Sequence, residues 1–373
     1  MKKTMKFGVL FAISFTALNT FATIRTVSNN VNSPGQYTDL QAAITAAVSN
    51  DTIYIHRSDL NYGTVTIDKP LTMIGEGALP NKQIQLSTSS AYNVQIQTIN
   101  LSYGTFPITT SASGSKFYGL SVFSFNINAN SSGVGVNNLL FNRNKIAIIY
   151  LASNHSNVTL TQNIISAVSQ SSGSAGALVN STISNNLISS FNPITSQGSN
   201  NIISNNIFQN TFTARGAVVS NNIFYYSGTL NLSTILCTFS NNLFFGTNPV
   251  VGTSIISGTN TGTGNLFNVD PQFTTPSSVS IVLDYTYTNP SVGPFADFHL
   301  LSSSPGLNYG TDGTNIGIYG GNYSWIDGST TDSRYRYFAM PNQVPHMIQM
   351  DISNPSLPIN GTLNVNFNAK TQN

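Results

Sequence analysis

The chain has 373 residues, of which 40% are hydrophobic and only 7% are charged, and its formal net charge at pH 7 is +2. Charged residues normally make up about a quarter of a globular chain, so amides and hydroxyls must form most of this surface. The low charge argues against intrinsic disorder, and the scarcity of Ala, Glu, Lys and Leu excludes a coiled coil or a large helical bundle.

The first 22 residues have the pattern of a signal peptide. Three lysines come first, at Lys2, Lys3 and Lys6, and an apolar run too short to span a bilayer follows at residues 7–18. Thr20-Phe21-Ala22 then forms a small-residue cleavage site. We therefore expect residues 1–22 to be removed and the protein to be exported, to the periplasm, the cell surface or the extracellular medium.

Removing these lysines changes the charge balance, because the 14 Lys and Arg fall to 11 against 12 Asp and Glu. A chain near −1 has no basic face for phosphates, so nucleic acid is not expected as a partner. No second apolar stretch is long enough to place an integral membrane segment in the mature chain. Cys237 is the only cysteine and cannot form an internal disulfide. The oligomeric state is left open.

Residues 23–51 predict an N-terminal cap that contains one amphipathic helix. Thr38-Asp39-Leu40-Gln41 has the capping-box pattern, and a stripe at helical spacing follows, made of Leu40, Ala43, Ile44, Ala47 and Val48. Three short strands are expected next, at residues 52–55, 64–67 and 71–75. A helix in front of stacked strands would cover the open end of their core.

The middle of the chain repeats a Ser-Asn-Asn-[Ile/Leu]-[Ile/Phe] unit at intervals of about 20 residues. We expect each asparagine pair to turn the chain between two strands, because Asn tolerates the left-handed conformation, and the stacked amides to form a ladder. The second Asn of each copy marks these structural turns: Asn163, Asn186, Asn206, Asn222, Asn242 and Asn265. Ahead of one pair, alternation predicts a strand in which Ile235, Cys237 and Phe239 point inward.

Two stretches carry a resemblance to a known family. They are residues 37–77, which include Tyr37 to Ile44, Asp51 to Ile55 and Lys69 to Gly77, and residues 269–321, which include Val269 to Phe273, Asp297 to Leu300 and Ile316 to Gly321. The first resembles the N-terminal cap and first coils of pectate-lyase-like right-handed parallel β-helix proteins, and the second resembles the terminal coils of secreted bacterial β-helix repeat proteins. The resemblance implies an all-β fold, a right-handed parallel β-helix over residues 52–321.

Residues 322–373 are expected to form a C-terminal β cap or a small β-module. Strict alternation of apolar and polar residues predicts a half-buried strand around Val365 and Phe367, and a second strand is expected around Met347 to Ile352.

The distribution of carboxylates argues against the family's usual chemistry. The resemblance implies a Ca²⁺ site or grouped aspartates in the middle of the solenoid, but this chain has no Asp or Glu between Glu76 and Asp270. We therefore predict no cofactor and no metal site. A residual enzyme would need basic groups, and the candidates within about one repeat of each other are Arg143, Lys145 and His155.

Two functional hypotheses follow. The first is an exported non-catalytic protein, adhesin-like or structural, that binds polysaccharide or a cell-surface glycan, with Tyr225 and Tyr226 as candidate sugar-stacking rings. The alternative is a divergent polysaccharide lyase or glycoside hydrolase. Ice binding through rows of threonine is not favoured, because Thr-x-Thr does not recur at the repeat period.

Overall fold

The fold is described from a computed structural model. The described residues are 22–31, 34–58, 60–75, 95–104, 110–174, 176–193, 200–226, 231–246, 259–275, 297–325, 346–352 and 365–370. The predicted signal peptide lies outside them except for Ala22. No described helix is both long and apolar enough to cross a membrane.

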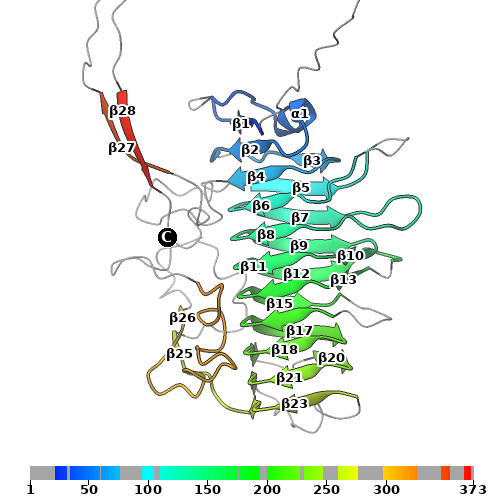
Figure 1. Ribbon diagram of the computed structural model, residues 1–373, viewed down its shortest axis with the longest axis vertical. Helices are drawn as coiled ribbons and strands as arrows, with labels where there is room; N and C mark the ends of the chain where they lie inside the picture. Colours follow the sequence, from blue (N-terminus) through cyan, green and yellow to red (C-terminus); the bar gives the residue numbers. More distant parts are fainter. Residues whose placement is uncertain are drawn as a thin grey trace, which may run out of the picture.

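Two long parallel sheets run the length of the molecule and form a β-solenoid (Figure 1). In spatial order, sheet 1 contains β1 (Ile24–Val27), β2 (Thr52–Ile55), β4 (Thr72–Gly75), β6 (Lys116–Tyr118), β8 (Leu140–Asn142), β11 (Thr159–Thr161), β14 (Thr182–Ser184), β16 (Ile202–Ser204), β18 (Val218–Ser220), β21 (Thr238–Ser240) and β23 (Thr261–Thr263).

Sheet 2 contains β3 (Thr64–Ile67), β5 (Gln95–Leu101), β7 (Ser121–Ile127), β9 (Lys145–Leu151), β12 (Ile164–Gln170), β15 (Leu187–Phe191), β17 (Ile207–Arg215), β19 (Ile223–Tyr226), β22 (Leu243–Gly246) and β24 (Leu266–Phe267), with β20 (Asn231–Ile235) also paired to β17. A short parallel pair, β10 (Asn154–Ser156) and β13 (Ala177–Val179), lies on a third side. The predicted parallel β-solenoid is confirmed, while its right-handedness stays a prediction.

The corner between the two sheets is built by two successive residues, which differ in backbone conformation and in burial. The first has a positive φ, for example 57° at Asn205 and 59° at Asn221, and the second is fully buried. The left-handed conformation therefore lies one residue before the asparagines that we marked as turns. In other rungs Gln162, Arg143 or Gly264 occupies that first position.

The second residues form a hydrogen-bonded ladder along the axis. Asn206 donates its backbone N–H and its Nδ2 to Oδ1 of Asn222, at 2.9 and 3.0 Å, and Asn222 donates in the same way to Asn242. The full ladder is Asn144, Asn163, Asn186, Asn206, Asn222, Asn242 and Asn265. Asn144 was missed because Arg143 replaces the first asparagine of its pair.

The predicted strand through Ile235, Cys237 and Phe239 is wrong. β20 ends at Ile235, which is 42% exposed, and Leu236 takes a φ of 57° before β21 begins at Thr238. Cys237 and Phe239 are buried, but a corner separates them from Ile235. Alternation alone could not reveal this corner, because a bulky leucine occupies its left-handed position.

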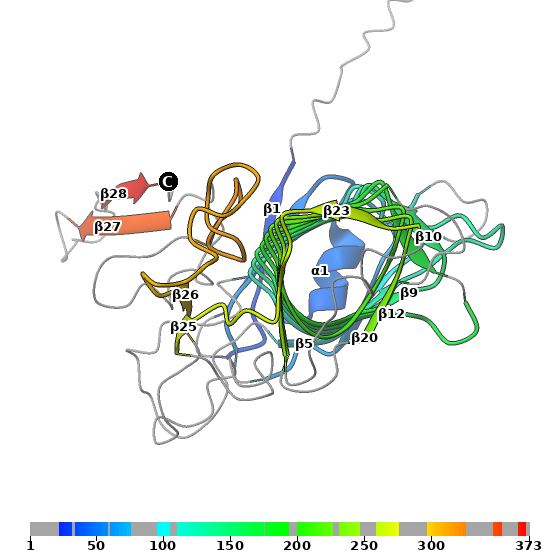
Figure 2. The same ribbon diagram turned by 90° about the horizontal axis from the view of Figure 1, so that it is seen from below.

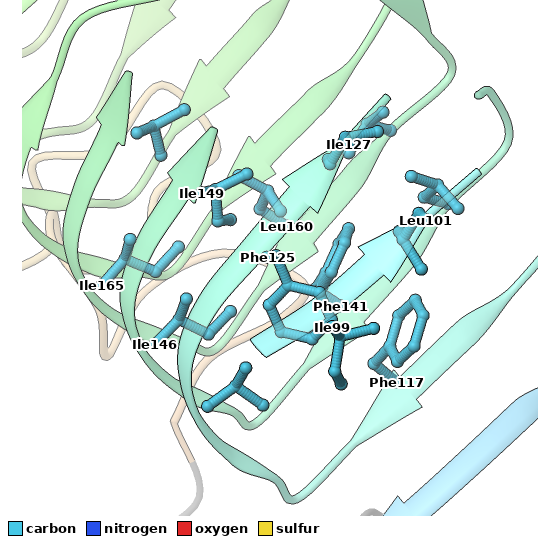
Figure 3. Packing of buried hydrophobic residues seen from close by; sticks show 14 of the residues in the cluster. Ile99, Leu101, Phe117, Phe125, Ile127, Phe141, Ile146, Ile149, Leu160 and Ile165 are labelled. Carbon is cyan, nitrogen blue, oxygen red and sulfur yellow. The ribbon is translucent and has the colours of Figure 1, made fainter. Parts of the chain in front are cut away.

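The interior of the solenoid is filled by aliphatic and aromatic side chains in layers. Phe208, Phe224, Phe244 and Phe267 stack in order along the axis, with ring centroids 4.5 to 5.2 Å apart. Figure 3 shows a neighbouring part of this core, in which Phe117, Phe125 and Phe141 pack together between the strands. Each layer needs the next to bury its faces, so the strands form a single continuous core.

One helix, α1 (Leu40–Ala46), lies at the β1 end of the stack (Figures 1 and 2). Its N-cap is Asp39, whose Oδ1 accepts a hydrogen bond from the backbone N–H of Ala42 at 2.6 Å, so the helix begins one residue later than the capping-box pattern predicts. Leu40, Ala43 and Ile44 are buried in the main core, whereas Val48 is 53% exposed. The role of α1 as a cap stays a prediction.

The C-terminal part departs from the expected coils. The two long sheets end at β23 and β24, and β25 (Phe273–Thr275) pairs antiparallel with β26 (Asp297–Leu300). Residues 301–325, here the flank segment, run outside the stack and past its corners (orange in Figure 2). β27 (His346–Ile352) and β28 (Val365–Lys370) form an antiparallel pair, a C-terminal β tail of the kind expected.

Candidate functional site

Arg143 and Lys145 lie together on the corner between β8 and β9. Arg143 occupies the left-handed position with a φ of 58°, and its side chain is only 2% exposed. Its Nε donates to Oε1 of Gln162, the residue at the same position of the next rung, at 3.1 Å. Burial of the guanidinium at a corner position gives Arg143 a structural role in the stack.

Lys145 is the first residue of β9 and is paired in register with Ile164 of β12. Its row continues along the outer edge of sheet 2 through Leu187, Ile207 and Ile223. Burial beside these apolar residues lowers the pKa of Lys145 to about 8. A lysine with this pKa is partly neutral just above physiological pH and could act as a base.

His155 lies at the far end of the same rung, in β10. β9 separates it from the corner, and its seven residues span about 20 Å at the rise of an extended strand. The ring is fully buried, Nδ1 lies 2.9 Å from the carbonyl oxygen of Val136, and Nε2 accepts from the backbone N–H of Ser153. Burial lowers its pKa to about 4, so the ring is neutral at pH 7. The structure therefore brings Arg143 and Lys145 together but not His155.

Tyr225 is half-buried and does not present an open face. Its ring packs against Phe245 at 5.7 Å and edge-on against Phe273 at 5.2 Å, and burial raises the pKa of its hydroxyl, with the charge of Asp270 adding to the effect. The contact with Phe245 lies within sheet 2, whereas the contact with Phe273 joins sheet 2 to β25, which follows the last rung. The side chain of Tyr226 lies outside the described part of the chain.

The flank segment covers the corner row that sequence analysis treated as simple turns. Asn185 donates Nδ2 to the carbonyl oxygens of Ile318 and Gly320 at 3.0 and 2.7 Å, and Asn241 donates to that of Tyr309 at 2.8 Å. The apolar residues beneath form a second core outside the solenoid: Ile164, Leu187, Ile207, Ile223, Leu243, Phe273, Phe298, Ile316, Ile318 and Trp325. This part of the corner is occupied by the chain itself.

Sheet 1 carries a surface row of residues, exposed from Ile202 to Thr261 and half-buried at Thr159 and Thr182, that the sequence repeat did not reveal. The first residues of six consecutive strands are paired in register along the axis, and we call them the outer row: Thr159, Thr182, Ile202, Val218, Thr238 and Thr261. All six are β-branched, and Ile202 and Val218 are 51% and 49% exposed. The third residue of each strand is Ser or Thr.

Of these six strands only β11 and β23 read Thr-x-Thr, so Thr-x-Thr does not recur from rung to rung, although a Ser or Thr ends every strand of the row. Successive ladder asparagines are separated by 23, 20, 16 and 20 residues. These unequal separations conceal a strand pattern that is in register in space. The missed signal is the residue four positions before each marked turn, counted from the asparagine rather than at a fixed period.

Among the described residues, no three His, Cys, Asp or Glu side chains gather where they could hold a metal ion. No protein-family model matches the chain, and no curated protein matches it. The fold class therefore stands on the described strands and their pairing: this is a parallel β-solenoid protein.

Proposed function

We propose that the protein is an exported, non-catalytic β-helix protein of the pectate-lyase-like, secreted bacterial type that binds a glycan or a glycan-coated surface. The signal-peptide pattern at residues 1–22 supports export, and the resemblance of residues 37–77 to the N-terminal cap and first coils supports the family. In-register strand pairing and the asparagine ladder hold each rung in place, so the solenoid is a rigid scaffold for the side chains on its surface.

One observation carries the binding function, namely the exposed outer row of sheet 1. The six strands that hold it contain no Lys, Arg, Asp or Glu, and the side chains of the outer row offer methyl groups and hydroxyls. Sugar rings combine apolar C–H faces with hydroxyl rims, and a surface with both features complements them. Many weak contacts repeated along one rigid axis add to a useful affinity.

The alternative is a divergent polysaccharide lyase or glycoside hydrolase, and the observation that favours it is the lowered pKa of Lys145 beside Arg143. In a lyase, neutral Lys145 would take the proton next to a uronate carboxylate that Arg143 binds. The burial of Arg143 opposes this alternative, since its guanidinium is turned toward Gln162 within the stack.

A paired experiment tests the two functions. Purified chain without residues 1–22 is incubated with neutral and acidic polysaccharides, and both retention on the polymer and release of unsaturated or reducing sugar are measured. The proposal expects retention without product. Product formation that disappears in Lys145→Ala would establish the enzyme instead, and neither retention nor product on any polymer would end both proposals.

A further inference from the structure

The outer row does not stand alone on sheet 1. Exposed asparagines in the left-handed conformation lie two positions before the first strand residue in four successive rungs, those of Leu140, Thr159, Thr182 and Ile202: Asn138, Asn157, Asn180 and Asn200. Gly216 and Leu236 hold this position before Val218 and Thr238. Asn157 donates Nδ2 to Oδ1 of Asn138 at 3.0 Å, so at least this pair of amides is aligned along the axis. The face therefore has an amide row beside a row of methyl and hydroxyl groups.

The side chains of this face are held in fixed positions. β-branched residues on strands have restricted χ1 angles, and parallel neighbours one rung apart are about 4.8 Å from each other. Thr238 and Thr261 share a hydrogen bond between their Oγ1 atoms at 3.3 Å. Little side-chain entropy is lost when a ligand covers groups that are already ordered.

The charge of the face restricts the chemistry of its partner. None of the corner residues or outer-row strands carries a charge; the register continues past Thr159 through Leu140 to the exposed Lys116, so a positive charge lies two rungs beyond that end of the row. Along the chain, Arg215 lies three positions before Val218. An uncharged face offers no Coulombic attraction to a polyanion and desolvates no charge against a neutral polymer. A neutral partner is therefore favoured over pectate-like acidic chains.

The order of chemical groups along the outer row favours a sugar polymer over ice as the ligand. Hydroxyl-bearing Thr159 and Thr182 are followed by aliphatic Ile202 and Val218, and hydroxyls return at Thr238. This interruption breaks a continuous hydroxyl lattice, which ice would match. It creates an apolar step between two polar steps, which matches the alternation of C–H faces and hydroxyl rims in a chain of sugar rings.

We propose that sheet 1 binds a neutral polysaccharide laid along the solenoid axis, with Ile202 and Val218 against the C–H faces of sugar rings and the neighbouring threonines and corner asparagines bonded to sugar hydroxyls. This inference rests on the proposed glycan-binding function and gives it a site and a ligand class. The site differs from the flank occupied by residues 301–325 and from the Arg143 corner.

The test uses the chain without residues 1–22 and measures depletion from solution by cellulose, chitin and an insoluble β-1,3-glucan, with alginate, polygalacturonate and ice as comparison surfaces. Val218→Lys places a charge in the outer row and is expected to weaken binding about tenfold, the equivalent of about 1.4 kcal/mol. Thr182→Val keeps the shape and removes one hydroxyl, with an expected loss of about threefold. Val134→Lys is the matched control, since Val134 is 51% exposed but lies away from sheet 1.

The outcomes separate the site from the function. Retention of the native chain on a neutral polymer, lost in Val218→Lys and kept in Val134→Lys at equal thermal stability, supports the inference. Equal binding by both lysine variants would overturn the sheet 1 site while leaving glycan binding intact. No retention on any polysaccharide would overturn both, and retention only on ice or only on acidic polymers would overturn the neutral sugar ligand.

Discussion

The indole Nε1 of Trp325 donates a hydrogen bond to the carbonyl oxygen of Asn185 at 2.6 Å, across 140 residues of chain. Asn185 in turn donates its side-chain amide to Ile318 and Gly320, so one corner residue receives and gives hydrogen bonds to the flank segment. Trp325 is 4% exposed and belongs to the second core. The flank segment is therefore an integral part of the folded solenoid.

This relationship predicts the effect of removing the indole donor. Trp325→Phe retains an aromatic ring but leaves the buried carbonyl of Asn185 without its indole partner. We expect the free energy of unfolding to fall by about 2 kcal/mol, from the lost hydrogen bond and the smaller ring. Urea unfolding measures the change, and Tyr323→Phe, at a side chain that is 51% exposed, serves as the control. Equal stability of the two variants would show that the flank contributes little.

The asparagine ladder predicts a larger loss at its centre. Asn222 is fully buried, accepts two hydrogen bonds from Asn206, and donates Nδ2 to the carbonyl oxygens of Ile203 and Ser220 and to Asn242. Asn222→Ala leaves several buried polar groups unpaired, and we expect a loss of about 3 kcal/mol or more.

The control for the ladder is Asn154→Ala, because Asn154 is exposed at the start of β10. Its expected change is within about 0.5 kcal/mol. Chemical denaturation of both variants compares them directly. A small loss at Asn222, similar to that at Asn154, would mean that water replaces the ladder amide without penalty.

Leu236 predicts a stabilising substitution. It has a φ of 57° and is 53% exposed, so its side chain makes the left-handed corner unfavourable and gains little burial in return. Leu236→Asn places at this corner the residue found at Asn200 and Asn180 in earlier rungs, and we expect a gain of about 1 kcal/mol. Differential scanning calorimetry should show a higher Tm. Leu301→Asn, which replaces another exposed leucine, should show no gain.

Much of the architecture follows from local patterns. Short β-branched runs separated by Asn and Gly predict strands and corners, and the conserved spacing within each Ser-Asn-Asn unit places Asn186, Asn206, Asn222 and Asn242 at equivalent positions of successive rungs. These predictions succeed because each depends on a few neighbouring residues. Burial of Phe208, Phe224 and Phe244 in one stack follows from the same unit.

Features that depend on register or on distant contacts could not be predicted. Rungs of unequal length conceal the outer row. The flank segment has apolar residues like those of a terminal coil, but they pack against the outside of the solenoid. Arg143 and Lys145 are close to His155 in the sequence, but the extended strand β9 runs from their corner to the side of the rung that holds His155. Proximity within one repeat is a poor guide when the repeat encircles a core.

His155 predicts a pH dependence of stability in the acidic range. The neutral ring satisfies both neighbours, since Nδ1–H donates to the carbonyl oxygen of Val136 and Nε2 accepts from the N–H of Ser153. Burial lowers the folded-state pKa to about 4 from the ordinary 6.5. Above pH 6.5 both states are neutral, so the contribution of His155 is fully retained there.

Between pH 6.5 and pH 4 the unfolded chain binds a proton that the folded chain excludes, so the free energy of unfolding falls as the pH is lowered, by about 3 kcal/mol in total from this group. Below about pH 4 the group adds no further change. Denaturant unfolding from pH 7.5 to pH 4 measures the slope, and His155→Gln removes the titrating ring while keeping a side-chain donor. The variant should lose this part of the pH dependence, and an unchanged slope would assign the acid sensitivity to other groups.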